Sequence, residues 1–234
     1  MTARLPLFPL GTVLYPGLLL PLHIFEERYR TLVRDLTGGR TGEQAEEDAP
    51  AFGVVAIRQG REVGADGIRE LHDVGCSAEI RRVEALPDGR FDLVTTGAQR
   101  FRLLQLDVDA APYLIGEVEY LEEESDDTAS VEAAAVLAGS VARHYLAYRD
   151  QLLSLQGQAP RVRGPLPAEP LVLSYLVAAA MVLDRQDKQD LLEAPDVAAR
   201  LRAELALLRR ERVMLAHLPS LPGADIAREA GSPN

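Results

Sequence analysis

His72, Asp73 and Cys76 form the only cluster in this chain whose residue types match a nucleophilic site. A cysteine nucleophile needs a base within hydrogen-bonding reach and an oxyanion hole, and sequence spacing supplies neither. Cys76 alternates with Ala78 and Ile80, a pattern that predicts a strand with a buried, structural thiol. We therefore favour a structural Cys76 and keep a cryptic hydrolase that uses Cys76 and His72 as an alternative.

Metal and nucleotide chemistry have no matching pattern. The four histidines (His23, His72, His144 and His217) are scattered singly, without the paired spacing of zinc ligands. A Gly-x4-Gly-Lys-Ser/Thr phosphate loop is absent, and Lys188 is the only lysine in the chain. We expect no catalytic residues, no metal and no cofactor, and hence a protein that is not an enzyme.

Composition narrows the class of partner. The chain has 234 residues and a net charge of -11, which disfavours binding to nucleic-acid phosphates or to anionic membranes. The single cysteine fits a reducing cytoplasm, and the start of the chain lacks the pattern of a signal peptide. The longest apolar run, 171–183, is too short to cross a bilayer and predicts a buried helix.

The first half of the chain has the periodicity of a small β structure. Four prolines (Pro6, Pro9, Pro16 and Pro21) make the apolar opening segment extended, in part at a sheet edge. An amphipathic helix is expected over 24–37 and a polar loop over 38–50. Short strands are expected over 51–121, with a bulge after Ile80 and a hairpin turn at Leu86-Pro-Asp-Gly89.

The second half is predicted to be helical. An acidic run, 122–127, precedes a helical stripe that ends at Leu152, and these acids are expected to stabilise the helix N-terminus. Further helices are expected over 171–183, over 188–193 and after Pro195. The last helix carries five arginines, for which we favour a solvated face and keep docking on an acidic partner as the alternative: Arg200, Arg202, Arg209, Arg210 and Arg212. The predicted organisation is a β subdomain over 1–121, a helical bundle over 122–218 and a frayed tail over 219–234.

Several sequence blocks in this order resemble the N-terminal, substrate-binding domain of Lon proteases, and in particular the stand-alone bacterial proteins made of that domain. The blocks are Leu5-Pro-Leu-Phe-Pro-Leu10, Val13-Leu-Tyr-Pro-Gly17, Pro21-Leu-His-Ile-Phe-Glu-Glu-Arg-Tyr29, Phe52-Gly-Val-Val55, Gly60-Arg-Glu-Val-Gly64, Val74-Gly-Cys76, Leu86-Pro-Asp-Gly-Arg90, Gly97-Ala-Gln-Arg-Phe101 and Lys188-Gln-Asp-Leu-Leu-Glu193. The resemblance implies an α+β fold, with a PUA-like β pseudobarrel that carries one or more short helices and is followed by an α-helical bundle. It also implies recognition of unfolded or tagged polypeptides, possibly together with a separate protease or chaperone.

A peptide-binding rim is one interpretation of the first helix and its neighbours. The candidate residues are His23, Phe25, Arg28, Tyr29, Arg30 and Arg100. In this reading the arginines bind carbonyl or carboxylate groups and the rings supply apolar contact. The alternative reading is structural: Tyr29 packs, His23 caps or packs, and the arginines form ion pairs.

The leading hypothesis is a non-catalytic polypeptide-binding module. The alternative is an RNA-binding module, because PUA-like barrels elsewhere bind RNA. The acidic charge, the absence of tryptophan and an aromatic content of 5% speak against that alternative.

Overall fold

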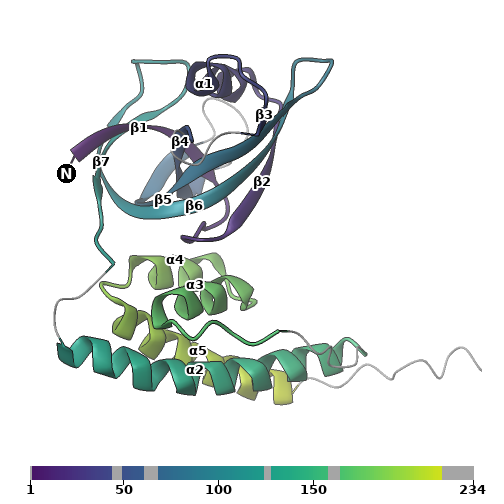
Figure 1. Cartoon of the computed structure of the whole chain (residues 1–234), viewed down its shortest axis with the longest axis vertical. Coiled ribbons are helices and arrows are strands. Elements are labelled where there is room, and N and C mark those ends of the chain that lie inside the picture. The colour runs from purple at the N-terminus through teal and green to yellow at the C-terminus, as the bar shows by residue number, and fades with distance from the viewer. Residues whose placement is uncertain (1, 44–48, 61–67, 124–127, 158–163, 218–234) are drawn as a thin grey trace, which may run out of the picture. The chain divides into compact units, whose positions relative to one another are not determined.

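The computed structural model describes residues 2–43, 49–60, 68–123, 128–157 and 164–217 (Figure 1). Within these ranges the chain is α+β, as predicted, with one seven-stranded sheet and five helices. The helical bundle and the PUA-like relationship stay predictions. The predicted tail, 219–234, lies outside the described residues.

Five of the strands pair into a closed ring. The sheet order is β2-β6-β7-β1-β4-β5-β3, and an additional pairing joins β5 to β6. The strands are β1 (Thr2–Leu10), β2 (Leu19–Ile24), β3 (Gly42–Glu43), β4 (Ala51–Gly60), β5 (Ile68–Ala85), β6 (Phe91–Asp107) and β7 (Ile115–Tyr120). Only the β1–β4 pairing is parallel among those described. Because β2 pairs with β6 alone, its other side is an open sheet edge in the described structure.

The hairpin between β5 and β6 follows the local sequence. The Leu86 amide donates to the Arg90 carbonyl at 2.9 Å, and Gly89 has a φ of 80°, which favours glycine. The β5–β6 register shifts between Ile80 and Arg82, so the predicted bulge is confirmed.

Helix α1 (Glu27–Thr37) covers an apolar cluster at one end of the strands (Figure 1). Its Tyr29 ring stacks on Phe8 with the ring centroids 4.0 Å apart, and both side chains are buried. The helix starts later than predicted because Ile24 is still paired with Phe91 in the β2–β6 ladder. Gly38 ends it in the left-handed conformation.

The chain forms two compact units. The first comprises Met1–Glu124 and Ala178–Pro195, and the second comprises Ser125–Val177 and Asp196–Asn234. The remaining helices are α2 (Thr128–Leu155), α3 (Pro170–Ala180), α4 (Arg185–Glu193) and α5 (Val197–Ala216). The sequence pattern assigns 178–195 to the helices that start at 122, whereas the structure groups these residues, and α4 with them, with the strands.

The core of the second unit contains two ionisable side chains, and one of them corrects an expectation from the sequence. Arg200, predicted to be solvated, is fully buried; its guanidinium lies 4.0 Å from the Tyr175 ring centroid and donates to the Ser174 hydroxyl at 3.2 Å. Glu204, one turn further along α5, is also fully buried, and burial raises the pKa of its carboxyl well above the ordinary value. Helical periodicity alone did not separate these inward-facing charges from the solvated ones.

Gly97 provides a test of the ring. A Cβ atom at this position would overlap the Tyr15 carbonyl oxygen. The Gly97 amide donates to the Leu18 carbonyl and the Gly97 carbonyl accepts from the Gly17 amide, each at 2.8 Å. We expect Gly97→Ala to lower the free energy of unfolding by about 2 kcal/mol or more, because β6 and the backbone at Tyr15 must move apart. Gly139→Ala in α2, where a Cβ meets nothing within 4 Å, should instead raise it by about 0.5–1 kcal/mol. Urea denaturation followed by circular dichroism measures both, and a neutral Gly97→Ala would contradict the packing described.

Candidate functional site

The open edge of β2 and the turn into α1 form a surface that we call the β2–α1 corner, comprising residues 19–30. Residues of β2 alternate: Leu20, Leu22 and Ile24 contact the core cluster, while Leu19, Pro21 and His23 are exposed. Leu19 is 70% exposed and Phe25 is 51% exposed. Large apolar side chains therefore lie in solvent next to an open strand edge, which is an arrangement that polypeptide-binding surfaces use.

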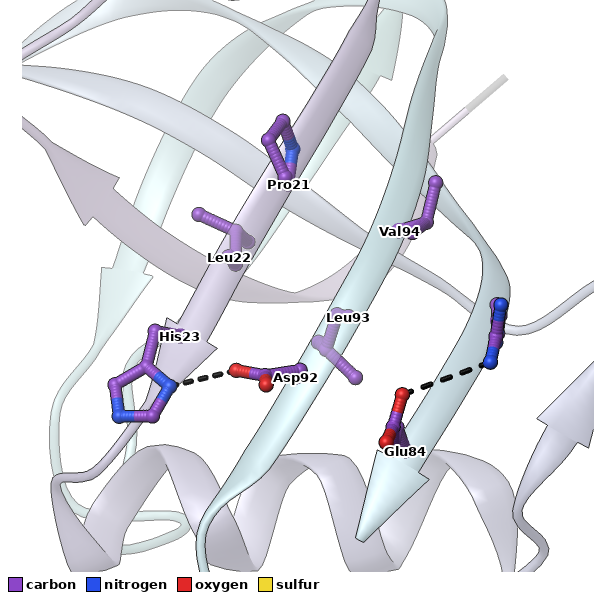
Figure 2. A pocket seen from close by; sticks show the side chains of 8 residues that line it. Pro21, Leu22, His23, Glu84, Asp92, Leu93 and Val94 are labelled. Atoms are coloured by element: carbon purple, nitrogen blue, oxygen red, sulfur yellow. Dashed lines mark hydrogen bonds and ion pairs between the residues drawn. The ribbon is translucent and has the colours of Figure 1, made fainter. Parts of the chain in front are cut away.

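His23 is held at the surface by two charged neighbours. Its Nδ1 lies 2.6 Å from the Asp92 carboxylate, and its Nε2 lies 3.0 Å from the Arg90 guanidinium. Figure 2 shows His23 and Asp92 projecting from the paired strands β2 and β6. The His23 ring also stands against Phe25, with centroids 6.4 Å apart. His23 is thus the penultimate residue of β2 and belongs to an exposed group of hydrogen-bonded polar side chains. The N-cap residue of α1 is Glu26, so His23 does not have the capping role considered from the sequence.

Two hollows flank His23 and share Leu22. The first, which we call the strand hollow, has a volume of about 350 Å3 and includes Pro21, Asp92 and Val94 (Figure 2). The second, the helix hollow, has a volume of about 210 Å3 and includes Phe8, Phe25 and Tyr29. Both are open depressions with mainly apolar walls, suited to side chains of a bound segment more than to an enclosed small molecule.

The other candidates on α1 are held by local partners. Arg28 pairs with Glu26 at 3.0 Å and lies over the Tyr29 ring at 4.5 Å. Arg30 donates to the Gly89 carbonyl at 2.7 Å and pairs with Glu27 at 2.7 Å. The structure thus brings the five candidates from His23 to Arg30 into one region, but the Tyr29 ring is buried and both arginines already have partners.

Arg100 lies apart from this corner and is 1% exposed. Its guanidinium pairs with Glu123 at 2.5 Å and donates to the carbonyls of Leu192 and Ala194, at the end of α4, at 2.7 and 2.6 Å. The ion-pair interpretation therefore replaces the rim interpretation for Arg100, because a buried guanidinium with three acceptors is not accessible to a peptide. Glu123 belongs to the acidic run 122–127 that was expected to stabilise a helix N-terminus, and it forms an ion pair with Arg100. Residues 124–127 of this run lie outside the described residues.

Cys76 and His72 do not form a nucleophilic pair in this geometry. Cys76 is buried and donates from Sγ to the Ser77 carbonyl, and burial raises the pKa of its thiol far above the ordinary value. His72 is 3% exposed, with its Nδ1 3.7 Å from a Glu193 oxygen on α4. Burial, followed by the nearby charge of Arg58, lowers the pKa of His72. In the described part of the chain no three His, Cys, Asp or Glu side chains are grouped as metal ligands would be.

The docking of α4 on the strands is a feature that sequence reasoning missed. The Gln189 amide donates to the Val74 carbonyl at 2.9 Å, and the Tyr15 hydroxyl donates to the Lys188 carbonyl at 2.8 Å. Gln189 is fully buried although it lies in a polar helix. Its place on the same face as the buried leucines of α4 was the one sequence feature that could have indicated this docking. Across the described helices, none is both long and apolar enough to span a membrane.

Comparison with known proteins identifies the family. The model of the ATP-dependent protease La (LON) substrate-binding domain matches residues 4–210, so the chain belongs to this family. It is 30% identical to a Lon protease of Anaeromyxobacter dehalogenans over 91% of this chain and 24% of that protein. It is 29% identical to the Lon protease of Escherichia coli K12 over 89% of this chain and 25% of that protein. The chain thus spans about a quarter of the length of these relatives, and the match covers the substrate-binding domain without a protease or ATPase domain.

Solved structures agree with this assignment. A Lon N-terminal domain protein from Xanthomonas campestris superposes with a TM-score of 0.53 at 26% identity, covering 93% of this chain and 99% of that one. The N-terminal domain of the Mycobacterium avium complex Lon protease has a TM-score of 0.58 at 18% identity, covering 88% and 98%, and shows likeness of fold. The resemblance read from the sequence is therefore confirmed.

Removal of the Arg100 side chain tests its structural role. Arg100→Met leaves the Glu123 carboxylate and two helix carbonyls without their donor, so we expect the free energy of unfolding to fall by about 3 kcal/mol. Arg102→Met, at an exposed position on the same strand, is the matched control and should change it by less than about 0.5 kcal/mol. Urea denaturation monitored by circular dichroism gives both values. Equal effects of the two substitutions would show that the buried pair is not important for stability.

His72 should make stability depend on pH. Because its pKa is lowered in the folded protein, the unfolded chain binds the proton more readily, and stability is lost as the pH falls below the ordinary histidine value of about 6.5. Between about pH 7.5 and about pH 5.5, we expect the free energy of unfolding to fall less in His72→Gln than in the parent protein, because this variant cannot take up the proton. The measurement is urea denaturation of both proteins across this range. Parallel pH profiles would contradict the burial of an uncharged His72.

Proposed function

We propose that this chain is a non-catalytic polypeptide-binding module that holds exposed apolar segments of unfolded or tagged proteins, or presents them to a separate protease or chaperone. Membership of the LON substrate-binding domain family supports a role in substrate recognition. The proposed partners are polypeptides rather than RNA, because the chain carries a net charge of -11.

The observation that carries the proposal is the β2–α1 corner itself. Phe25 lines the helix hollow, and Val94 of the neighbouring strand lines the strand hollow; both are exposed, as is Leu19 at the start of β2. An unfolded chain offers alternating apolar side chains that can enter such depressions, whereas a native protein buries most of its own. Preference for the unfolded form then follows from the apolar surface that only this form can offer.

His23, Asp92 and Arg90 supply polar groups between the two hollows. Their side chains are about half exposed, and each is already held by a neighbour, so they are oriented before a ligand arrives. Such groups can accept or donate hydrogen bonds to the backbone of a bound segment. In this proposal they fix where the segment crosses β2 and do no chemistry.

Fluorescence anisotropy with a labelled model protein tests the proposal. We expect a permanently unfolded, reduced and alkylated form to bind more tightly than the native form, and Phe25→Ser to weaken this binding about tenfold. Val136→Ser, which removes a 75% exposed valine from α2, is the matched control and should bind like the parent protein. Equally weak binding of unfolded and native forms would refute the proposed function. If Phe25→Ser bound the unfolded protein as tightly as the parent protein does, the binding site would lie outside the β2–α1 corner.

A further inference from the structure

The ring of strands is closed along part of β5 and β6, and the remaining ends of these two strands separate. These strands pair from Ala85 with Phe91 as far as Val74 with Arg102, and the described pairing ends there. Beyond this point the 68–73 part of β5 pairs with β4 alone, and the 103–107 part of β6 pairs with β7 alone, among the described residues. Each strand therefore has a stretch of edge whose backbone N–H and C=O groups no neighbouring strand in the described structure uses.

A hollow of about 420 Å3 lies at this opening, and we call it the gap hollow. Glu70 and Leu71 of β5 line it from one side, and Leu103 and Leu106 of β6 line it from the other. Tyr113, from the loop before β7, closes part of its wall and donates to Asp35 of α1 at 2.9 Å. The volume and the leucines suit one large apolar side chain.

The sheet surface beside this edge, over β6, β7 and β1, is acidic. A second hollow of about 340 Å3 adjoins the gap hollow at Leu106 and Val108, which line both. Asp109 and Glu117 belong to it, together with Arg4, whose charge is already balanced by Asp107 at 2.9 Å. Asp109 and Glu117 therefore leave two negative charges in this hollow, which favours a cationic ligand group.

The register of β6 and β7 places the gap-hollow leucines, Leu103 and Leu106, on one face of the sheet and Glu117 on the other, and the two hollows meet at Leu106 and Val108. Leu106 lies opposite the buried Gly116, and Gln105 lies opposite the exposed Glu117. Consecutive side chains of a strand point to opposite faces. A further strand added at the edge of β6 would accordingly direct one side chain into the gap hollow and the next to the face that carries Glu117, where a long basic side chain can extend over β6 toward the acidic hollow.

We propose that the opening between β5 and β6 binds an extended polypeptide segment by strand addition to β6. A large apolar residue of this segment occupies the gap hollow, and an adjacent arginine or lysine lies against Asp109 and Glu117. The inference rests on the proposed function and adds a second site with a sequence preference. Backbone pairing supplies affinity for any extended chain, while the two hollows select an apolar residue beside a basic one.

Labelled synthetic peptides of about nine residues test the proposal by fluorescence anisotropy. A peptide with a central Phe-Arg pair should bind about tenfold more tightly than one with Phe-Glu at the same positions. N-methylation of alternate backbone amides, on the edge that faces β6, should also weaken the Phe-Arg peptide about tenfold, because it removes strand hydrogen bonds and leaves the side chains intact. One of the two sets of alternate amides should therefore be sensitive to N-methylation and the other should not, and unchanged affinity after N-methylation of each set in turn would overturn strand addition.

Two variants locate the site. Leu106→Arg, which places a cation at the 37% exposed boundary of the hollows, should abolish binding of the Phe-Arg peptide, whereas Val136→Arg on α2 should not change it. The double variant Asp109→Asn, Glu117→Gln should bring the Phe-Arg and Phe-Glu affinities together. Thermal denaturation of each variant by circular dichroism checks that it is folded.

The same experiments separate this inference from the proposed function. If Leu106→Arg binds the Phe-Arg peptide as the parent does while the unfolded model protein is still held, the gap site is wrong and the proposed function stands. If the parent protein binds the Phe-Arg peptide but shows no preference for the unfolded protein, the gap site stands and general holding of unfolded chains is wrong. Absence of both activities overturns both.

Discussion

The buried guanidinium of Arg100 joins three parts of the chain. It donates to Glu123, which follows the last strand, and to the Leu192 and Ala194 carbonyls, where α4 ends. Terminal carbonyls of a helix have no partner within the helix, and a planar cation with several N–H donors can satisfy two of them together with a carboxylate. Gln189 and Tyr15 add hydrogen bonds between α4 and the strand region. Arg100 is the charged member of the group of contacts that hold α4 on the strands, and it satisfies the carbonyls at the end of this helix.

Helix α1 connects the proposed binding surfaces. Tyr29 lines both the helix hollow and the gap hollow, and its ring is fixed by stacking on Phe8. A displacement of α1 would change both hollows together. The pairing of Tyr113 with Asp35 restrains such a displacement, and burial together with this carboxylate raises the pKa of Tyr113 to about 12. The proposed sites are thus built on a rigid apolar layer, while their exposed side chains remain available for contact.

Sequence patterns predicted the structural features that depend on residues close together in the chain. The Leu86–Gly89 turn, the bulge after Ile80 and the helix around 188–193 were all identified in this way. Patterns did not predict which charges turn inward: Arg100 and Arg200 have the same residue type as the solvated arginines, and their acceptors lie far away in the sequence. For the candidate site, the sequence indicated the segment from His23 to Arg30, whose binding role stays a prediction, but it did not indicate the hollows. Their walls combine segments that are distant in the sequence: β2 with β6, β1 with β2 and α1, or β5 with β6. Strand alternation does not reveal which strands pair or where their pairing stops.

The open edge of β2 has a proline at its centre. Pro21 carries no N–H, and so a strand from a second copy of the chain finds one donor fewer along this edge. The edge of β6 in the proposed opening is different, because it borders a hollow lined by β5 and α1 and not a flat surface. A folded domain presents its own edges as part of a broad sheet that cannot enter such a recess, whereas a single extended chain can. In this proposal, access to the recess distinguishes a single extended chain from a folded protein. The same restriction keeps copies of this chain from pairing with one another through their own sheet edges.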